Sequence, residues 1–148
     1  ENEHLMFAIE SGRFASIETS VNIADQWSLH HALPEASSRG LGVIAKRPIA
    51  NAAWQYATRP DGVYGEVYWD RFQELAYDLR ADPLDLALRF TAFAPGVSSA
   101  IMGTVKVANL ERAVSTVARG PLDQAQLDAI EARWQERGQG FDGLDGQV

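Results

Sequence analysis

Apolar positions recur along this chain with two different periods, one typical of helices and one typical of strands. Segments of the two kinds alternate along the sequence. In six segments the apolar residues return every three or four positions, as in amphipathic helices that bury one face. These predicted helices are residues 1–11, 28–39, 70–80, 82–94, 108–118 and 121–137. Asp82 followed by Pro83 predicts an N-cap with a proline at the first helical position, and Pro34 predicts a kink or a new turn within residues 28–39.

Three shorter segments have the pattern of β-strands. Residues 14–23 alternate between an apolar face and a face of small or polar groups, as in a strand with one buried side. The uninterrupted apolar run at residues 41–45 predicts a strand buried on both faces, and residues 97–102 predict a third strand. Strands that alternate with helices pair in parallel, which predicts an α/β fold. Because three strands are few for such a sheet, we expect the chain to be part of something larger.

Three other segments carry specific expectations. The connection at residues 49–69 is long and rich in aromatic residues, and connections of this length are usually functional. The segment after Gly138 is rich in glycine, and we expect it to be loose. In the helix at residues 108–118 we expect one apolar stripe to pack inward. This stripe consists of Leu110, Ala113, Val114 and Val117.

Composition and charge narrow the class of protein. The 148 residues, which suit a single domain, include 20 acidic and 13 basic side chains, and the net charge of −7 argues against nucleic-acid binding and suits a cytoplasmic protein. The chain has no cysteine, which excludes disulfides, thiolate metal sites and cysteine nucleophiles. His30 and His31 are adjacent and face different ways on a helix, so no metal site is predicted. The sequence has neither an apolar run of membrane-spanning length nor the features of a signal peptide, so no membrane association is expected.

The best candidate for binding chemistry is the loop between the third strand and the helix that follows it. In parallel α/β folds, function gathers at the carboxyl ends of strands, and the N-terminus of a helix attracts anions. Gly103 lets a ligand approach the backbone, Thr104 adds a hydroxyl donor and Lys106 adds a positive charge. This pattern predicts a phosphate site. The alternative interpretation is an ordinary strand–helix turn with a solvated lysine.

The ends of the other two strands carry further polar residues. Lys46 and Arg47 precede Pro48 at the end of the second strand, and two cations there suit a phosphate or a carboxylate. Two other interpretations are ion pairs at a loop entrance and Schiff-base chemistry through Lys46. On the first strand, Glu18 and Asn22 suit hydrogen bonds to a polar ring or an amide, or are ordinary polar residues of a strand end.

Several blocks of the sequence together resemble the aldo/keto reductase family. The resemblance rests on FASIETSVNIAD at residues 14–25 and RGLGVIAKRPIA at residues 39–50, with shorter similarities at residues 87–90, 95–97, 101–104 and 109–110. It implies that residues 1–148 form the C-terminal half of a (β/α)8 TIM barrel, with about three parallel strands, the sixth to the eighth, and flanking helices.

The resemblance also implies a reaction and a cofactor. Family members reduce carbonyl compounds by hydride transfer from NADPH, less often from NADH. Gly103, Thr104 and Lys106 fall in the loop that holds the adenosine phosphate. The family contacts the 2′-phosphate and the adenine at the positions of Asn109, Arg112 and Ala113. Arg112 and Ala113 depart from the usual Glu-Asn pair, and the charges of Lys106 and Arg112 favour the extra phosphate of NADPH.

Other departures concern the nicotinamide. Glu18 stands where the family usually has a glutamine that binds the nicotinamide amide, and a carboxylate can accept from the amide NH2 but cannot donate to its oxygen. Lys46 stands where many members have a tyrosine that stacks on the ring. Arg47 and Pro48 follow it, and Arg47 suits a backbone or phosphate contact.

The catalytic Asp, Tyr, Lys and His of the family come from the first half of the barrel, and no segment of this chain resembles those motifs. The chain alone is therefore expected to be inactive. As a reductase of a small carbonyl substrate it would need the missing N-terminal half, supplied by a longer chain or by a partner. The alternative is a catalytically inactive half-barrel, stabilised by self-association as a homodimer because its outer strands expose unpaired edges.

Overall fold

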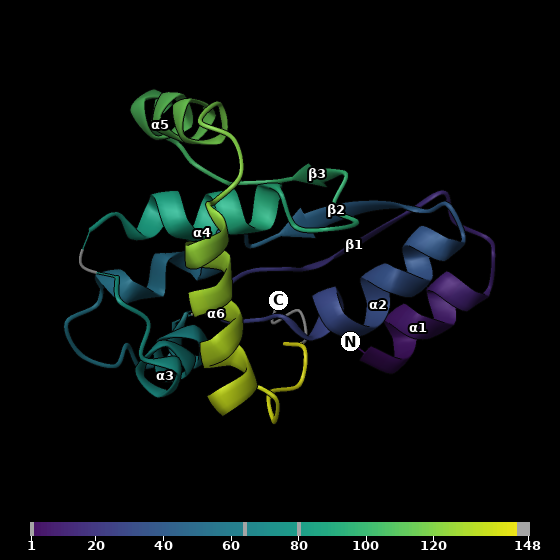
Figure 1. Cartoon of the computed structure of the whole chain (residues 1–148), viewed down its shortest axis with the longest axis horizontal. Coiled ribbons are helices and arrows are strands. Elements are labelled where there is room, and N and C mark those ends of the chain that lie inside the picture. Colours follow the sequence, from purple (N-terminus) through teal and green to yellow (C-terminus); the bar gives the residue numbers. More distant parts are fainter. Residues whose placement is uncertain (1, 64, 80, 145–148) are drawn as a thin grey trace.

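The structure is a computed structural model that describes residues 2–63, 65–79 and 81–144 (Figure 1). The expectations for residues 1, 64, 80 and 145–148 lie outside this part of the chain. The helices are α1 (Asn2–Glu10), α2 (Trp27–Ser38), the 3-10 helix η1 (Ala50–Gln55), α3 (Glu66–Leu75), α4 (Pro83–Ala92), α5 (Val107–Val117) and α6 (Gln124–Arg137). The strands are β1 (Ser16–Ser20), β2 (Gly42–Lys46) and β3 (Ser99–Ala100).

The three strands form one parallel sheet in the order β1-β2-β3. β3 is shorter than predicted because the chain turns away toward α5 directly after it. Two backbone hydrogen bonds nevertheless extend the pairing, from Ser98 N to the Val43 carbonyl (2.9 Å) and from Ile101 N to the Ala45 carbonyl (3.0 Å). Three parallel strands with flanking helices confirm the predicted α/β fold class.

Helices cover one face of this sheet. Ile17 and Val21 of the first strand segment and Val43 and Ala45 of β2 are buried in one apolar cluster with residues of α1 and α2. The expectation that residues 41–45 are buried on both faces is wrong, since Ile44 is only half-buried on the opposite face. The reason is that the described helices pack on the other side of the sheet.

A second apolar cluster joins the helices that follow β2. Phe72 and Leu75 of α3 are buried together with Ile130 and Trp134 of α6. α3 begins four residues before the predicted helix, at Glu66, and it ends at Leu75 because Ala76 adopts a left-handed conformation (φ 49°). The two clusters give the body of the molecule its stability.

The N-cap predicted at Asp82 is confirmed, whereas the effect expected of Pro34 is not, and α6 begins at Gln124 rather than at the predicted residue 121. The carboxylate of Asp82 accepts a hydrogen bond from Asp85 N (3.1 Å), and α4 begins with Pro83. Asp123 and Gln126 form a capping box at the start of α6. Pro34 lies inside α2, which is a single helix from Trp27 to Ser38.

The segment at residues 141–144, predicted to be loose, is held against the body. Arg71 Nη2 donates to the Asp142 carbonyl (2.6 Å), and its guanidinium lies over the Phe141 ring at 4.7 Å from the centroid. Leu144 N donates to Asp25 Oδ2 (3.3 Å). The expectation of a loose tail is therefore wrong for this described segment, because a buried arginine and a buried carboxylate bind its backbone.

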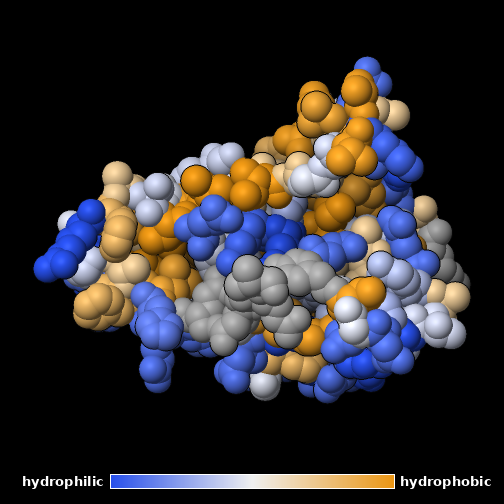
Figure 2. Space-filling view, turned by 180° about the vertical axis from the view of Figure 1, so that it is seen from behind, coloured by the Kyte–Doolittle hydropathy of each residue, from blue (hydrophilic) through white to orange (hydrophobic). Residues whose placement is uncertain are grey.

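α5 projects from the body and packs mainly against α4 (Figure 1). Only Ala113 of the predicted inward stripe is buried, while Leu110 and Val114 are 53% and 63% exposed and Val117 is half-buried. Hydrophobic side chains accordingly gather on the projection formed by α5 (Figure 2). The inward packing expected of this stripe is wrong, because no element in the described part of the chain covers it.

Within the described residues, no helix has both the length and the apolar character needed to cross a membrane.

Candidate functional site

A cavity of about 290 Å³ lies where η1, the start of α4 and the β3–α5 loop meet. Gly103, Thr104, Asn109 and Arg112, all predicted as binding residues, lie in its wall. Its other lining residues are Ile49, Ala52, Trp54, Gln55, Pro83, Leu84 and Met102. One side of the cavity is therefore formed by four predicted residues of the β3–α5 loop and α5. The other side is a mostly apolar wall formed by η1 and the start of α4.

The loop before α5 is organised by one threonine hydroxyl. Thr104 Oγ1 accepts hydrogen bonds from Lys106 N (3.2 Å) and from Asn109 Nδ2 (3.2 Å). These bonds fix the turn that leads into the first turn of α5, where the helix presents N–H groups and a partial positive charge. A Cβ added to Gly103 would meet no atom within 4 Å, so the backbone there is open to a ligand.

Arg112 places a positive charge at the rim of the cavity. Its Nη2 donates to Asp82 Oδ1 at 3.0 Å, and the two side chains are 60% and 43% exposed. Burial alone would raise the pKa of Asp82, but the hydrogen bond from Asp85 N and the guanidinium of Arg112 outweigh it and hold that pKa below its usual value. Because the ion pair is exposed, Arg112 can exchange Asp82 for an anionic ligand at small cost.

The backbone between β2 and η1 has an unusual conformation. Arg47, Ala50, Asn51 and Ala52 all have positive φ values, between 46° and 56°. Non-glycine residues avoid this left-handed region, so the segment stores strain beside the cavity. Two tight turns hold it, with Ala50 N donating to the Arg47 carbonyl (2.9 Å) and Ala52 N to the Ile49 carbonyl (2.7 Å).

The remaining predicted residues lie outside the cavity wall. Lys46 is half-buried at the carboxyl end of β2, opposite Ser20 in the sheet register. Arg47 Nη1 donates to Ser20 Oγ (3.0 Å), and the carbonyl of the buried Pro48 accepts from Thr91 Oγ1 (3.1 Å). These three residues thus line the strand ends rather than the cavity.

The other three residues divide between exposed and buried positions. Glu18 is exposed on the uncovered face of the sheet, opposite Ile44 in the register. Lys106 is exposed directly before α5, close in sequence to the cavity but not in its wall. Ala113 is buried where α5 packs against α4.

Sequence reasoning did not identify a buried polar cluster beyond the carboxyl end of β1. The Asp25 carboxylate is fully buried, with Arg71 Nη1 at 3.6 Å from Oδ1 and the Tyr68 hydroxyl at 3.4 Å from Oδ2. Burial, reinforced by the charge of Asp25, raises the pKa of Tyr68 to about 12. The partners are more than 40 positions apart in sequence, so no local signal could have paired them.

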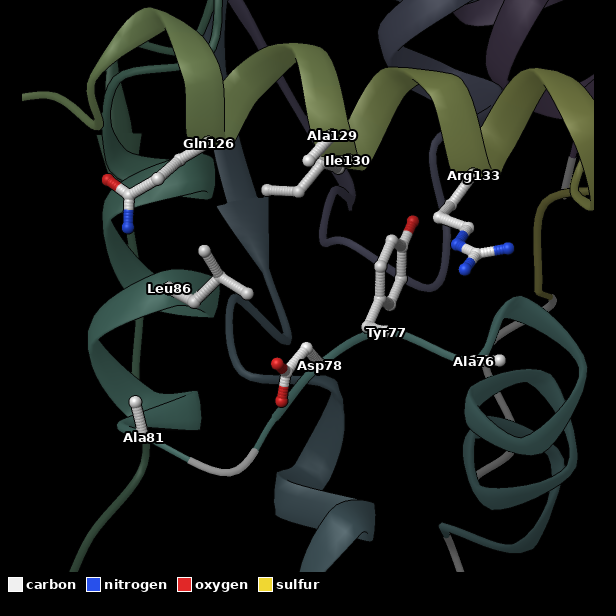
Figure 3. A pocket seen from close by; sticks show the side chains of 9 residues that line it. All are labelled: Ala76, Tyr77, Asp78, Ala81, Leu86, Gln126, Ala129, Ile130 and Arg133. Atoms are coloured by element: carbon white, nitrogen blue, oxygen red, sulfur yellow. The ribbon is translucent and has the colours of Figure 1, made fainter.

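A larger groove of about 760 Å³ lies between α4, α6 and the segment that joins α3 to α4 (Figure 3). Leu86 and Ile130 are among its apolar lining residues, and the Tyr77 ring lies between them and Arg133. The Tyr77 hydroxyl is engaged, because it donates to the Ile23 carbonyl (2.8 Å). None of the predicted binding residues lines this groove, so we assign the candidate site to the smaller cavity.

Comparison with solved structures places this arrangement in a known fold. The structure is similar to the holo form of aldo-keto reductase AKR11C1 from Bacillus halodurans, with a TM-score of 0.66 and 19% sequence identity. The apo form of the same protein gives a TM-score of 0.67, also at 19% identity. Each match covers 87% of this chain and 46% of the other chain.

This chain has the fold of part of an aldo-keto reductase. It spans less than half the length of the aldo-keto reductase structures that it matches, as expected for a portion of the barrel. The predicted resemblance is therefore confirmed at the level of the fold. No protein-family model matches the sequence, and no curated protein matches it either.

Proposed function

We propose that the cavity beside α5 binds the adenosine phosphate of NADPH and that this chain is the cofactor-binding half of an aldo-keto reductase. The observation that carries the proposal is the convergence of Gly103, Thr104, Asn109 and Arg112 in one cavity at the start of a helix. A hydroxyl, an amide and a guanidinium are the groups that bind phosphate oxygens, and an open backbone at a helix N-terminus adds N–H donors.

Each residue has a distinct part in this proposal. Thr104 and the backbone at Gly103 hold the adenosine phosphate, and Asn109 both positions Thr104 and faces the nucleotide. Arg112, helped by the nearby charge of Lys106, selects the 2′-phosphate that distinguishes NADPH from NADH. Ala113 sets the position of α5 on α4 rather than touching the ligand.

The nicotinamide end of the cofactor would extend toward the carboxyl ends of β1 and β2. Lys46, Arg47 and Pro48 lie at the end of β2, and Glu18 lies on the face of β1 that no described helix covers. Arg47 suits a phosphate contact and Glu18 suits acceptance from the carboxamide NH2. Lys46 contributes charge rather than the stacking that an aromatic ring provides.

The reaction proposed for the complete barrel is reduction of a small carbonyl compound in the cytoplasm. When bound, the cofactor supplies the hydride, and this chain's residues hold and orient it. The proton for the carbonyl oxygen needs a donor with a tuned pKa. No segment here resembles the family's catalytic motifs, so we assign that donor to the complementary half, in the same polypeptide or in a partner chain.

Nucleotide titrations of the isolated chain test the cofactor proposal. We expect NADPH to bind more tightly than NADH. Arg112→Ala should weaken NADPH binding about tenfold, because it removes one charge-assisted contact, and should have little effect on NADH binding. Arg39→Ala is the matched control. Arg39 Nε donates a hydrogen bond to Glu35 Oε1 (2.5 Å), and this pair lies on α2, far from the cavity. Equal affinity for the two nucleotides, or equal losses in the two variants, would refute the proposal.

A second candidate function is a catalytically inactive half-barrel stabilised by self-association. The uncovered face of the sheet and the exposed apolar side chains of α5 support this alternative. It requires no nucleotide, so a chain that binds neither NADPH nor NADH but forms stable dimers would favour it.

A further inference from the structure

The guanidinium of Arg112, which the proposed function assigns to the 2′-phosphate, is already bound to an anion of the chain itself. Its Nη2 donates to Asp82 Oδ1 at 3.0 Å and joins two helices, because Arg112 lies on α5 and Asp82 is the N-cap of α4. Pro83 and Leu84, which follow Asp82 directly, line the same cavity as Arg112. The Asp82 carboxylate therefore lies at the edge of the space in which a phosphate would meet the guanidinium.

Neither helix depends on this ion pair for its place in the fold. Asp82 Oδ1 also accepts a hydrogen bond from Asp85 N (3.1 Å), so the carboxylate still caps α4 when Arg112 leaves it. The end of α5 is held separately, since Arg119 Nη1 donates to Asp85 Oδ1 at 2.6 Å. Ala113 is also buried where α5 packs against α4. Arg112 can thus move from Asp82 to a ligand while both helices stay in place.

The pair between Asp82 and Arg112 is weak enough to be exchanged, but it opposes the binding of a phosphate. The two side chains are 43% and 60% exposed, so water screens the attraction between them. A phosphate monoester has about two negative charges and three acceptor oxygens, which make it a stronger partner for a guanidinium than one carboxylate. The phosphate displaces Asp82, and its affinity is lowered by the free energy needed to break the pair. A nucleotide without a 2′-phosphate does not use Arg112 and bears no such cost.

We propose that Asp82 is a specificity-determining residue, which occupies Arg112 in the free chain and thereby limits the affinity of the cavity for a 2′-phosphate. This inference rests on the proposed function and deepens it, because it concerns the choice between NADPH and NADH. Removal of the Asp82 charge strengthens the preference for a 2′-phosphate, whereas removal of Arg112 abolishes it. If Asp82 instead held Arg112 in place for the ligand, removal of its charge would weaken phosphate binding.

Asp82→Asn tests this role and keeps the fold. Asparagine caps helices as well as aspartate does, and its side-chain oxygen still accepts from Asp85 N, so the substitution removes the charge but not the cap. Adenosine 2′-monophosphate and adenosine are the probes, because they differ only in the phosphate group. In calorimetric titrations at about pH 8, where the monoester is a dianion, we expect the variant to bind the monophosphate about three- to fivefold more tightly than the native chain does. Adenosine binding should be unchanged.

Glu35→Gln is the matched control. It removes one negative charge from another exposed ion pair, in which Arg39 Nε lies 2.5 Å from Glu35 Oε1 on α2. We expect it to leave the affinity for both probes unchanged, because a net loss of negative charge alone does not release Arg112. An equal gain in Glu35→Gln, or monophosphate binding by Asp82→Asn that is no tighter than that of the native chain, would overturn the proposal.

A double variant separates exchange of the guanidinium from simple repulsion between two anions. In Arg112→Ala no guanidinium remains to be released, so adding Asp82→Asn should tighten monophosphate binding less than it does in the native chain. An equal or larger gain in the Arg112→Ala background would show that the carboxylate only repels the phosphate, and would overturn the proposal.

The same titrations distinguish failure of this inference from failure of the proposed function. A native chain that binds the monophosphate more tightly than adenosine, with no gain in Asp82→Asn, would refute only the role of Asp82. A native chain that binds both probes equally, with no loss in Arg112→Ala, would refute both the phosphate site and the role of Asp82.

Discussion

The helix-covered side of the sheet and the α5 region are built from similar side chains but have opposite degrees of packing. Leu33 on α2 and Val43 on β2 are almost completely buried, whereas Leu110 and Val114 on α5 are more than half exposed. The apolar side chains of the first region pack against other described residues, whereas those of α5 have no described residues packed over them. The candidate cavity lies at the boundary between them, since η1 and α4 provide one wall and the α5 loop provides the other. The stability of the body and the proposed nucleotide binding are therefore expected to depend on different parts of this chain.

The sharpest test of this comparison removes a buried charge. Asp25→Ala leaves the Arg71 guanidinium buried without its carboxylate and frees Leu144 N, so we expect a loss of about 3 to 5 kcal/mol in the free energy of unfolding. Asp61→Ala is the control, because the Asp61 side chain is 92% exposed, and it should cost less than about 0.5 kcal/mol. Urea unfolding followed by tryptophan fluorescence measures both. Equal losses would mean that the buried pair does not hold the body together.

The same substitution in the two regions gives the most direct comparison. Leu33→Ala should lower the free energy of unfolding by about 2 to 5 kcal/mol, because it leaves a cavity in the packed cluster. Leu110→Ala should lower it by less than about 0.5 kcal/mol in dilute solution. Circular dichroism during urea unfolding at low protein concentration checks both values. A large loss for Leu110→Ala would show that α5 is packed more tightly than its exposure indicates.

Two glycines separate stability from binding. A Cβ at Gly138 would overlap the Trp134 ring, so Gly138→Ala should destabilise the chain by about 1 to 3 kcal/mol without changing nucleotide affinity. A Cβ at Gly103 meets only open space in the free protein, so Gly103→Ala should leave stability unchanged but weaken NADPH binding. Unfolding curves and nucleotide titrations of both variants should give opposite results, and matching results would contradict the division.

The smallest expected effect is a change in the free energy of unfolding at acidic pH. The pKa of the Asp82 carboxyl is lower in the folded chain than in the unfolded chain, where it is about 3.9. The ionised carboxylate therefore stabilises the fold above that pH, and this contribution is lost as the pH falls through the lower pKa of the folded chain. Because both partners are exposed, we expect less than about 1 kcal/mol. Arg112→Ala should reduce this pH dependence in unfolding experiments between about pH 5 and pH 2, where the native chain loses stability on acidification. An unchanged pH profile would show that Arg112 does not stabilise the carboxylate.

The sequence predicted well those features that short-range patterns determine. Alternating periods predicted parallel strands between helices, and Asp82-Pro83 predicted the start of α4. The position of Gly103, Thr104 and Lys106 before a helix predicted a phosphate site, and the resemblance to the aldo/keto reductase family added Asn109 and Arg112; of these residues, all but Lys106 line one cavity. These signals work because secondary structure and capping depend on neighbours within a few residues.

Other features depend on contacts between residues that are far apart in the sequence, and these contacts leave no short-range pattern. The stripe on α5 was expected to pack inward because an amphipathic pattern shows that a face needs covering, but not which element covers it. The Asp25–Arg71 pair joins positions 46 residues apart, and its role in holding residues 141–144 has no local signature. The cavity wall contributed by Trp54 and Gln55 was foreseen only as part of a long, functional connection.

The left-handed run around Ala50, Asn51 and Ala52 has a consequence for homologous sequences. At these positions natural selection should act on backbone shape rather than on side-chain chemistry. Asparagine and glycine suit this conformation, whereas valine and isoleucine would clash with their own main chain. We therefore expect substitutions at these three sites in related sequences to stay within small or amide side chains.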